Sequence, residues 1–149
     1  MANYCGFTRT NYFSVTDEAK FRDIIGKCVA EDSVEIFKSD SEDGKFAFGC
    51  YSGIQEEISC GAYDDCYDCP KSETAECETP GLYEMLQSVV ASDDAIIITE
   101  VGHEKLRYLV GVSIIITKDS IRAVSLDIAS RDIAREMLAN PDFNTVMVH

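Results

Sequence analysis

The strongest constraint on the fold is a succession of three β-forming segments in the second half of the chain. Residues 95–101 and 106–117 are rich in Ile and Val, and a third such run covers 121–127. The polar links between them, 102–105 and 118–120, suit hairpins but are too short for the crossover that parallel strands need. Three strands joined in this way predict an antiparallel meander.

Three other stretches have the periodicity of amphipathic helices. Apolar residues recur at i, i+3, i+4 and i+7 from Phe21 to Cys28, which predicts a helix over 17–29. Further helices are expected over 82–91 and 128–139. In the last helix, the residues expected to face the core are Ile128, Ile133, Met137 and Leu138.

The first half of the chain adds strands to the sheet. The runs 11–15, 34–38 and 45–51 carry β-forming residues, and an Asp-Gly dipeptide between the last two favours a hairpin turn. A short strand is also expected at 146–148.

The order of these elements predicts an α+β fold in which an antiparallel sheet has about three helices packed on one face. The whole chain, 1–149, is expected to form a single domain. An acidic, Cys-rich loop over 52–79 is expected between its two halves, because the apolar periodicity stops there.

The charge of the chain restricts what it can bind. Its 149 residues include 27 acidic and 13 basic ones, for a formal net charge of −14. Phosphate backbones and anionic membranes are held by Lys and Arg, so we expect direct contact with neither nucleic acid nor membranes. No apolar run approaches the roughly 20 residues that cross a bilayer, and the N-terminus has no signal-peptide pattern. These features, with an odd number of cysteines, favour a cytoplasmic protein.

The loop over 52–79 contains eight acidic residues against Lys71 alone, and four of the seven cysteines. Four thiolates can supply the tetrahedral sulfur set of a structural zinc ion, and one pair has the CxxC spacing of a zinc knuckle. A disulfide pair and free thiols are the alternatives, since one CxxC is a weak form of the motif. The possible zinc ligands are Cys60, Cys66, Cys69 and Cys77.

Carboxylates are concentrated in two stretches, 31–43 and 52–78, whereas the C-terminal part from residue 95 on is nearly balanced. A clustered negative surface steers association with basic proteins, although acidity can also serve solubility alone. Aromatic residues among the acids are the expected anchors of an interface. The candidate contact residues are Asp40, Glu42, Asp43, Glu56, Glu57, Tyr63, Asp64, Asp65, Tyr67 and Asp68.

Signatures of common enzymes are missing from the sequence. It has no P-loop, dinucleotide-binding glycine motif, HExxH or GxSxG. His103 is the one internal histidine, so general-base chemistry near neutral pH would depend on it or on a shifted carboxylate. A small enzyme with a carboxylate or Cys/His103 site is therefore an alternative rather than the main expectation.

Two stretches carry a resemblance to known proteins. Residues 11–18 with the following helix, and residues 94–111 with the core GHEKLRY, resemble small acidic proteins carried on plasmids, prophages and conjugative elements. Some proteins of that group are anti-defence factors, the antirestriction and anti-CRISPR inhibitors. The resemblance implies a cytosolic protein that acts by binding another protein, and it implies no role for any single residue.

Together, these features favour a non-enzymatic binding or inhibitor protein whose negative surface engages a basic, nucleic-acid-binding partner. A structural zinc domain that uses its Cys-rich loop as the interface is the first alternative. The small enzyme is the second.

If the four thiolates close around a metal, protein purified without chelator should contain about one zinc ion per chain, measured by atomic absorption. Replacing one ligand, Cys66→Ser, should remove the metal because a structural site needs its full ligand set. Cys5→Ser, outside the set, should leave the metal content unchanged. Metal-free wild-type protein would leave only the disulfide or free-thiol alternatives.

Overall fold

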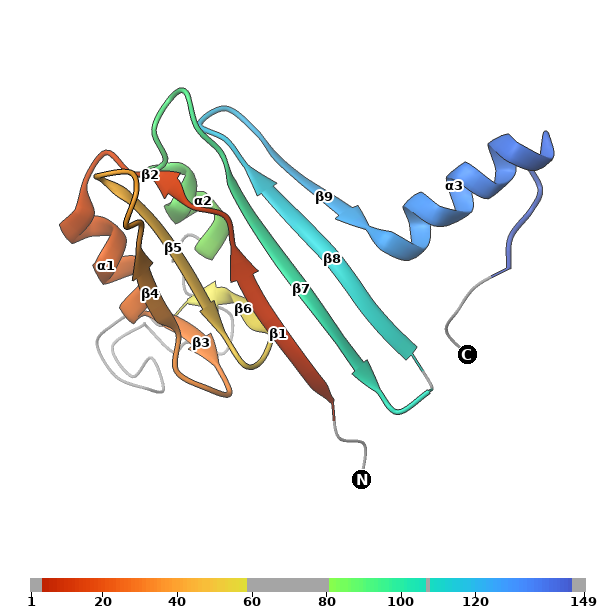
Figure 1. The fold of residues 1–149 in the computed structure, drawn as a ribbon, viewed down its shortest axis with the longest axis horizontal. Helices are drawn as coiled ribbons and strands as arrows, with labels where there is room; N and C mark the ends of the chain where they lie inside the picture. The colour runs from red at the N-terminus through yellow and green to blue at the C-terminus, as the bar shows by residue number, and fades with distance from the viewer. Residues whose placement is uncertain (1–3, 59–80, 107, 146–149) are drawn as a thin grey trace, which may run out of the picture.

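The chain forms an α+β fold built on one antiparallel sheet of seven strands, and the computed structural model describes residues 4–58, 81–106 and 108–145 (Figure 1). The strands of this sheet are β1 (Cys5–Thr10), β2 (Phe13–Ser14), β4 (Glu35–Lys38), β5 (Lys45–Cys50), β7 (Ile96–Glu104), β8 (Tyr108–Ile116) and β9 (Ile121–Ser125). A small second sheet pairs β3 (Cys28–Ala30) with β6 (Ile54–Ile58). The helices are α1 (Glu18–Gly26), α2 (Leu82–Gln87) and α3 (Leu126–Leu138).

The predicted meander is confirmed in the second half of the chain. β7 pairs with β8 along nine positions, from Ile96 opposite Ile116 to Glu104 opposite Tyr108, and β8 pairs with β9. β7 is longer than expected, so His103 lies on the strand rather than in the connecting turn. The turn itself is tight, with Lys105 in the left-handed region at φ 49°.

The strand expected at 11–15 is in fact the end of a longer, interrupted segment. β1 precedes it and pairs with β7, while β2 pairs with β5. Asn11 leaves the regular ladder between them. Its side-chain amide donates to the carbonyl of Ala95 (2.9 Å) and accepts from the backbone N–H of Ile97 (2.8 Å). The sequence does not predict β1, because its mostly small and polar residues produce little alternation of hydrophobic side chains.

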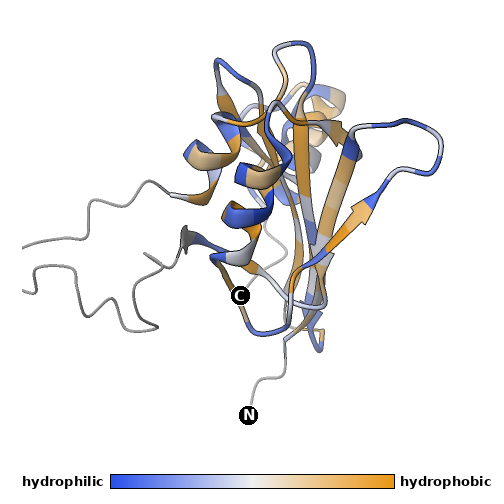
Figure 2. Cartoon of the chain, turned by 90° about the vertical axis from the view of Figure 1, so that its left-hand side faces the viewer, coloured by the Kyte–Doolittle hydropathy of each residue, from blue (hydrophilic) through white to orange (hydrophobic). Residues whose placement is uncertain are grey.

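The core lies on one face of the sheet, beneath α1 and α2, which lie on the same side of it (Figure 2). Four fully or almost fully buried phenylalanines form its centre: Phe13 from β2, Phe21 from α1, and Phe46 and Phe48 from β5. The rings of Phe13 and Phe21 meet edge to face, with centroids 5.5 Å apart. Such contacts add to the stabilisation that burial of large rings gives. These rings attach α1 to the sheet.

The expectation that all three helices pack on this face is wrong for α3. It leaves the edge strand β9 and extends away from the sheet (Figure 1), and none of its residues is buried. The four residues expected to face the core are all exposed: Ile128, Ile133, Met137 and Leu138. α3 does not pack on the core because it starts directly after Ser125, the last residue of β9, with no linker that would let the chain turn back over the sheet.

Two local assignments also differ. α1 ends at Gly26, so Cys28, expected on the helix, instead begins β3 as a partly buried residue. β6 occupies the start of the stretch predicted to be an irregular loop, because Ile54 packs on the core and the strand pairs with β3. The short strand expected at 146–148 lies outside the described residues. No helix in the described part of the chain is long and apolar enough to cross a membrane.

Removing the ring that joins α1 to the sheet should be severe. Phe21→Ala is expected to lower the free energy of unfolding by about 3–5 kcal/mol, because it leaves a cavity among buried rings. Urea denaturation followed by circular dichroism measures this loss. Leu106→Ala, at a fully exposed position of the β7–β8 turn, should cost less than about 1 kcal/mol. Equal losses in the two variants would contradict the proposed location of the core.

Candidate interaction surfaces

The connection between β4 and β5 carries three of the predicted contact residues. Asp40, Glu42 and Asp43 are all exposed there, and Gly44 closes the turn with a φ of 79°, which favours glycine. Lys45, the first residue of β5, forms an ion pair with Glu42 at 3.0 Å. The three carboxylates are thus open to solvent, and their contact with a partner stays a prediction.

Two further carboxylates adjoin this connection, and sequence reasoning missed them. The Lys45 ammonium is 3.9 Å from Asp94, and Asp93 acts on it electrostatically as well. The hydrogen bond and charge of Glu42, and then the other carboxylates, raise the pKa of Lys45. In the sequence, Asp93 and Asp94 lie between the helix expected over 82–91 and the strand expected over 95–101, far from the acidic stretch over 31–43. We name Asp40, Glu42, Asp43, Asp93 and Asp94 the hairpin cluster.

Asp94 also fixes the backbone at this end of the sheet. Its carboxylate accepts hydrogen bonds from the backbone N–H groups of Ser14 (2.8 Å) and Ala95 (2.8 Å). Partial burial works to raise the pKa of Asp94, but these two hydrogen bonds and the charge of Lys45 outweigh it, so the pKa lies below its usual value. The hairpin cluster is thereby attached to β2 and β7.

The other predicted acidic residues are not brought to the hairpin cluster. Glu56 is exposed on β6, which follows the opposite end of β5 from the hairpin. The Glu57 side chain lies outside the described part of the chain. So do the remaining predicted contact residues and metal ligands: Tyr63, Asp64, Asp65, Tyr67, Asp68, Cys60, Cys66, Cys69 and Cys77. Across residues 4–58, 81–106 and 108–145, no group of three or more His, Cys, Asp or Glu side chains could hold a metal ion.

His103 lies beside a cysteine. It is the direct cross-strand partner of Cys5, and both residues are exposed. Directly opposed residues of an antiparallel pair have Cβ atoms about 4.5–5.5 Å apart, so a thiol and an imidazole are neighbours here. No hydrogen bond joins the two described side chains, and neither lines any of the pockets described below. The arrangement provides proximity without a substrate cavity.

The face of the sheet opposite α1 and α2 is largely uncovered by the described residues. Alternation along β1 and β7 buries Thr8 and Ile98 towards the helices and turns Phe7 and Val101 the other way. We name the exposed apolar residues of this side the open face. They are Phe7, Ile97, Val101, Leu109 and Val124.

A shallow hollow of about 250 Å³ opens beside Phe7 on the open face. Its walls include Phe37 and Tyr51, and the Phe7 and Tyr51 rings meet edge to face with centroids 5.6 Å apart. The Arg9 guanidinium lies over the Phe37 ring, 4.3 Å from its centroid. This is a cation–π contact, so the hollow combines aromatic walls with the positive charge of Arg9, and Glu35 adds a negative charge to its lining.

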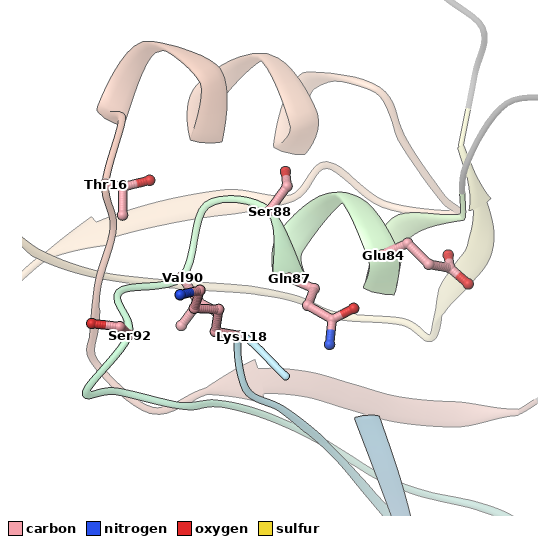
Figure 3. Close-up of a pocket in the computed structure, with 7 residues that line it drawn as sticks. All are labelled: Thr16, Glu84, Gln87, Ser88, Val90, Ser92 and Lys118. Atoms are coloured by element: carbon pink, nitrogen blue, oxygen red, sulfur yellow. The ribbon is translucent and has the colours of Figure 1, made fainter. Parts of the chain in front are cut away.

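A more polar groove of about 490 Å³ lies between α2 and the β8–β9 turn (Figure 3). Two of its polar side chains already have partners: the Gln87 amide donates to the carbonyl of Thr117, and the Ser88 hydroxyl donates to that of Met85. The side chain of Glu84 points away from Lys118 in Figure 3, so the two charges do not converge on one position. The groove therefore has no convergent pair of opposite charges.

Comparison with known proteins adds no family. No family model matches the chain, no curated protein is similar to it in sequence, and no solved structure matches its fold.

Asp94→Asn tests the role of the carboxylate at this end of the sheet. It should lower the free energy of unfolding at pH 7 by about 1–2 kcal/mol, because charged hydrogen bonds to two N–H groups are weakened. The pKa of Asp94 is lowered on folding, so its contribution is present above the ordinary value of 3.8 and disappears as pH falls through the lower folded value.

Wild type and Asp94→Asn should therefore converge in acid, as measured by urea denaturation over a pH series. Asp119→Asn, at an exposed turn position, should differ little from wild type throughout. A deficit in Asp94→Asn that persists unchanged in strong acid would exclude the carboxylate as its cause.

Proposed function

We propose that the protein acts by binding: its carboxylate-rich surface engages a basic, nucleic-acid-binding protein and competes with nucleic acid for it. An inhibitor of this kind acts without catalysis, and anti-defence inhibition is the role we favour. The proposal assigns the first contact with the partner to the hairpin cluster.

The observation that carries the proposal is the geometry of the hairpin cluster. Five carboxylates occur in two adjoining turns, and among the described residues Lys45 of β5 is the one basic residue that forms ion pairs with them. Asp40 and Asp43 are exposed and, within the described residues, have no ion-pair partner. Carboxylates clustered on adjoining turns present negative charge to solvent, and such charge attracts a basic groove as a phosphate backbone does.

The distribution of charge along the chain supports the same conclusion. Residues 95–145 contain seven acidic and six basic residues, so almost all of the net charge of −14 comes from the remainder. Acidity that served solubility alone would have no reason to avoid one third of the chain. The resemblance of residues 11–18 and 94–111 to proteins of mobile elements is in keeping with an inhibitor.

The two alternatives differ in what supports them. The zinc-domain alternative depends on cysteines outside the described residues, and the metal analysis above tests it. The enzyme alternative gains the Cys5–His103 contact, but neither residue lines the polar groove or the aromatic hollow. A binding protein is therefore the function that we put forward.

The probe for this proposal is the heparin-binding fraction of a nuclease-treated bacterial lysate, which is enriched in proteins with phosphate-binding grooves. Immobilised wild-type protein should capture a basic protein at low salt. It should release this protein at about 0.5 M salt, where the Debye length is roughly 4–5 Å, or on addition of duplex DNA. The double variant Asp40→Lys/Asp43→Lys should lose at least about tenfold in affinity, because it reverses two exposed charges.

A matched control carries the same change in charge elsewhere. Asp119→Lys/Asp142→Lys alters two exposed aspartates of the charge-balanced region and should keep most of the binding. If the two double variants lose binding equally, only net charge matters and the hairpin cluster is not the contact. If no basic protein is captured, the proposed function is wrong.

A further inference from the structure

α3 carries an apolar stripe that no described residue covers. Leu126, Ile133 and Met137 lie at i, i+7 and i+11, on one side of the helix. Their exposed fractions are 63%, 56% and 82%. Another side of α3 holds the chain that follows it, since Arg135 Nε donates to the carbonyl of Phe143 at 2.8 Å. The stripe is therefore the part of this amphipathic helix left without a packing partner.

The stripe of α3 continues the open face of the sheet. Gly111 of β8 is the cross-strand partner of Val101, and a Cβ atom on it would lie 3.1 Å from Cβ of Leu126. Leu126 thus begins α3 directly over the open face, and Ile133 and Met137 extend the same side of the helix outwards. Sheet and helix together present one apolar surface that is larger than either element alone.

The helix of the same chain cannot close over this face. α3 begins at the residue after β9, so its axis is set by the edge strand and it runs away from the sheet (Figure 1). A second copy of the chain has no such restriction, because it brings both a projecting helix and an uncovered sheet. Two-fold symmetry then covers both features in both copies.

We propose that the protein forms a two-fold symmetric dimer in which α3 of each copy packs across the open face of the other. This inference goes beyond the proposed function and uses other residues than the hairpin cluster. The reciprocal arrangement makes the open face and the stripe of α3 a single, self-complementary interface.

Charge favours a second copy over other occupants. Residues 95–145, which contain α3 and most of the open face, carry a net charge of only −1, so two copies do not repel each other there. Arg9 and Arg122 lie on the side of the open face and, within the described residues, neither has a carboxylate partner. Glu136 borders the stripe of α3 and also has no ion-pair partner there. The copies can therefore offer each other opposite charges at the edges of the contact.

The dimensions also fit. The 13 residues of α3 give a helix about 20 Å long, and the four strands β1, β7, β8 and β9 span about 14 Å. If α3 is treated as a cylinder of that length and half of its side is buried, the helix and the sheet beneath it together lose about 600 Å² of accessible surface in each contact. The two symmetric contacts then bury about 1,200 Å². This value lies at the lower end of specific protein interfaces.

Sedimentation velocity of the full chain tests the proposal. Wild type should sediment as a dimer at micromolar concentration, and Ile133→Glu should raise the dimer dissociation constant at least about tenfold by burying a charge in the contact. The matched control is Ile128→Glu, the same substitution on the same helix but on another side, at an exposed fraction of 53%. It should remain dimeric. Because both positions are exposed, thermal unfolding should be that of a folded protein in each variant.

A mixing experiment tests the reciprocal geometry itself. Val101→Glu alters the open face and should also give monomers. An equimolar mixture of Val101→Glu and Ile133→Glu should regain a weaker dimer, since one undamaged sheet can then accept one undamaged helix. Wild type that stays monomeric would overturn the proposal, as would a mixture that stays monomeric or an Ile128→Glu variant that dissociates as Ile133→Glu does. Binding of the heparin-selected partner does not depend on these outcomes.

Discussion

In the described part of the chain, two short helices cover a sheet of seven strands, and they are too short to cover all of it. α1 and α2 contain nine and six residues, whereas β7 and β8 alone contain nine residues each. A sheet buries its apolar side chains only where another layer covers them. The core is therefore confined to the region beneath α1 and α2, where Phe21 meets the rings of β2 and β5. Beyond that region, the described part of the sheet has one side with exposed apolar residues.

Sequence patterns predicted an element correctly where the conformation favoured by its own residues is also the one favoured by its tertiary contacts. The meander over residues 95–127 and the hairpin before β5 are long or strongly marked, and both are present. The position of α3 was not predictable, because its periodicity shows which side is apolar but not whether a surface lies within reach. Asp93 and Asp94 were missed for a related reason, since they approach the hairpin only through the pairing of β2 with β5. The acidic character of the hairpin itself followed directly from its residues.

The molecule separates two kinds of surface. Residues 1–94, which include the hairpin cluster, carry a net charge of −13, while the apolar open face belongs mainly to the charge-balanced C-terminal elements. Long-range attraction to a basic protein and short-range packing against an apolar surface have different physical requirements, since salt weakens the first and not the second. Because the charged surface and the apolar surface lie at different places, a substitution in one can leave the other unchanged.

The side chain of Asn11 has a consequence for how the strands find their alignment. β1 and β7 are separated by more than eighty residues, so no tight turn determines how they pair. A shift of one residue would turn every apolar side chain of β1 to the wrong side. The Asn11 amide makes one bond to the carbonyl of Ala95 and one to the N–H of Ile97, and a shift of one residue would turn both backbone groups away from it. One side chain at the break between β1 and β2 thus favours the observed pairing of β1 with β7 over a one-residue shift.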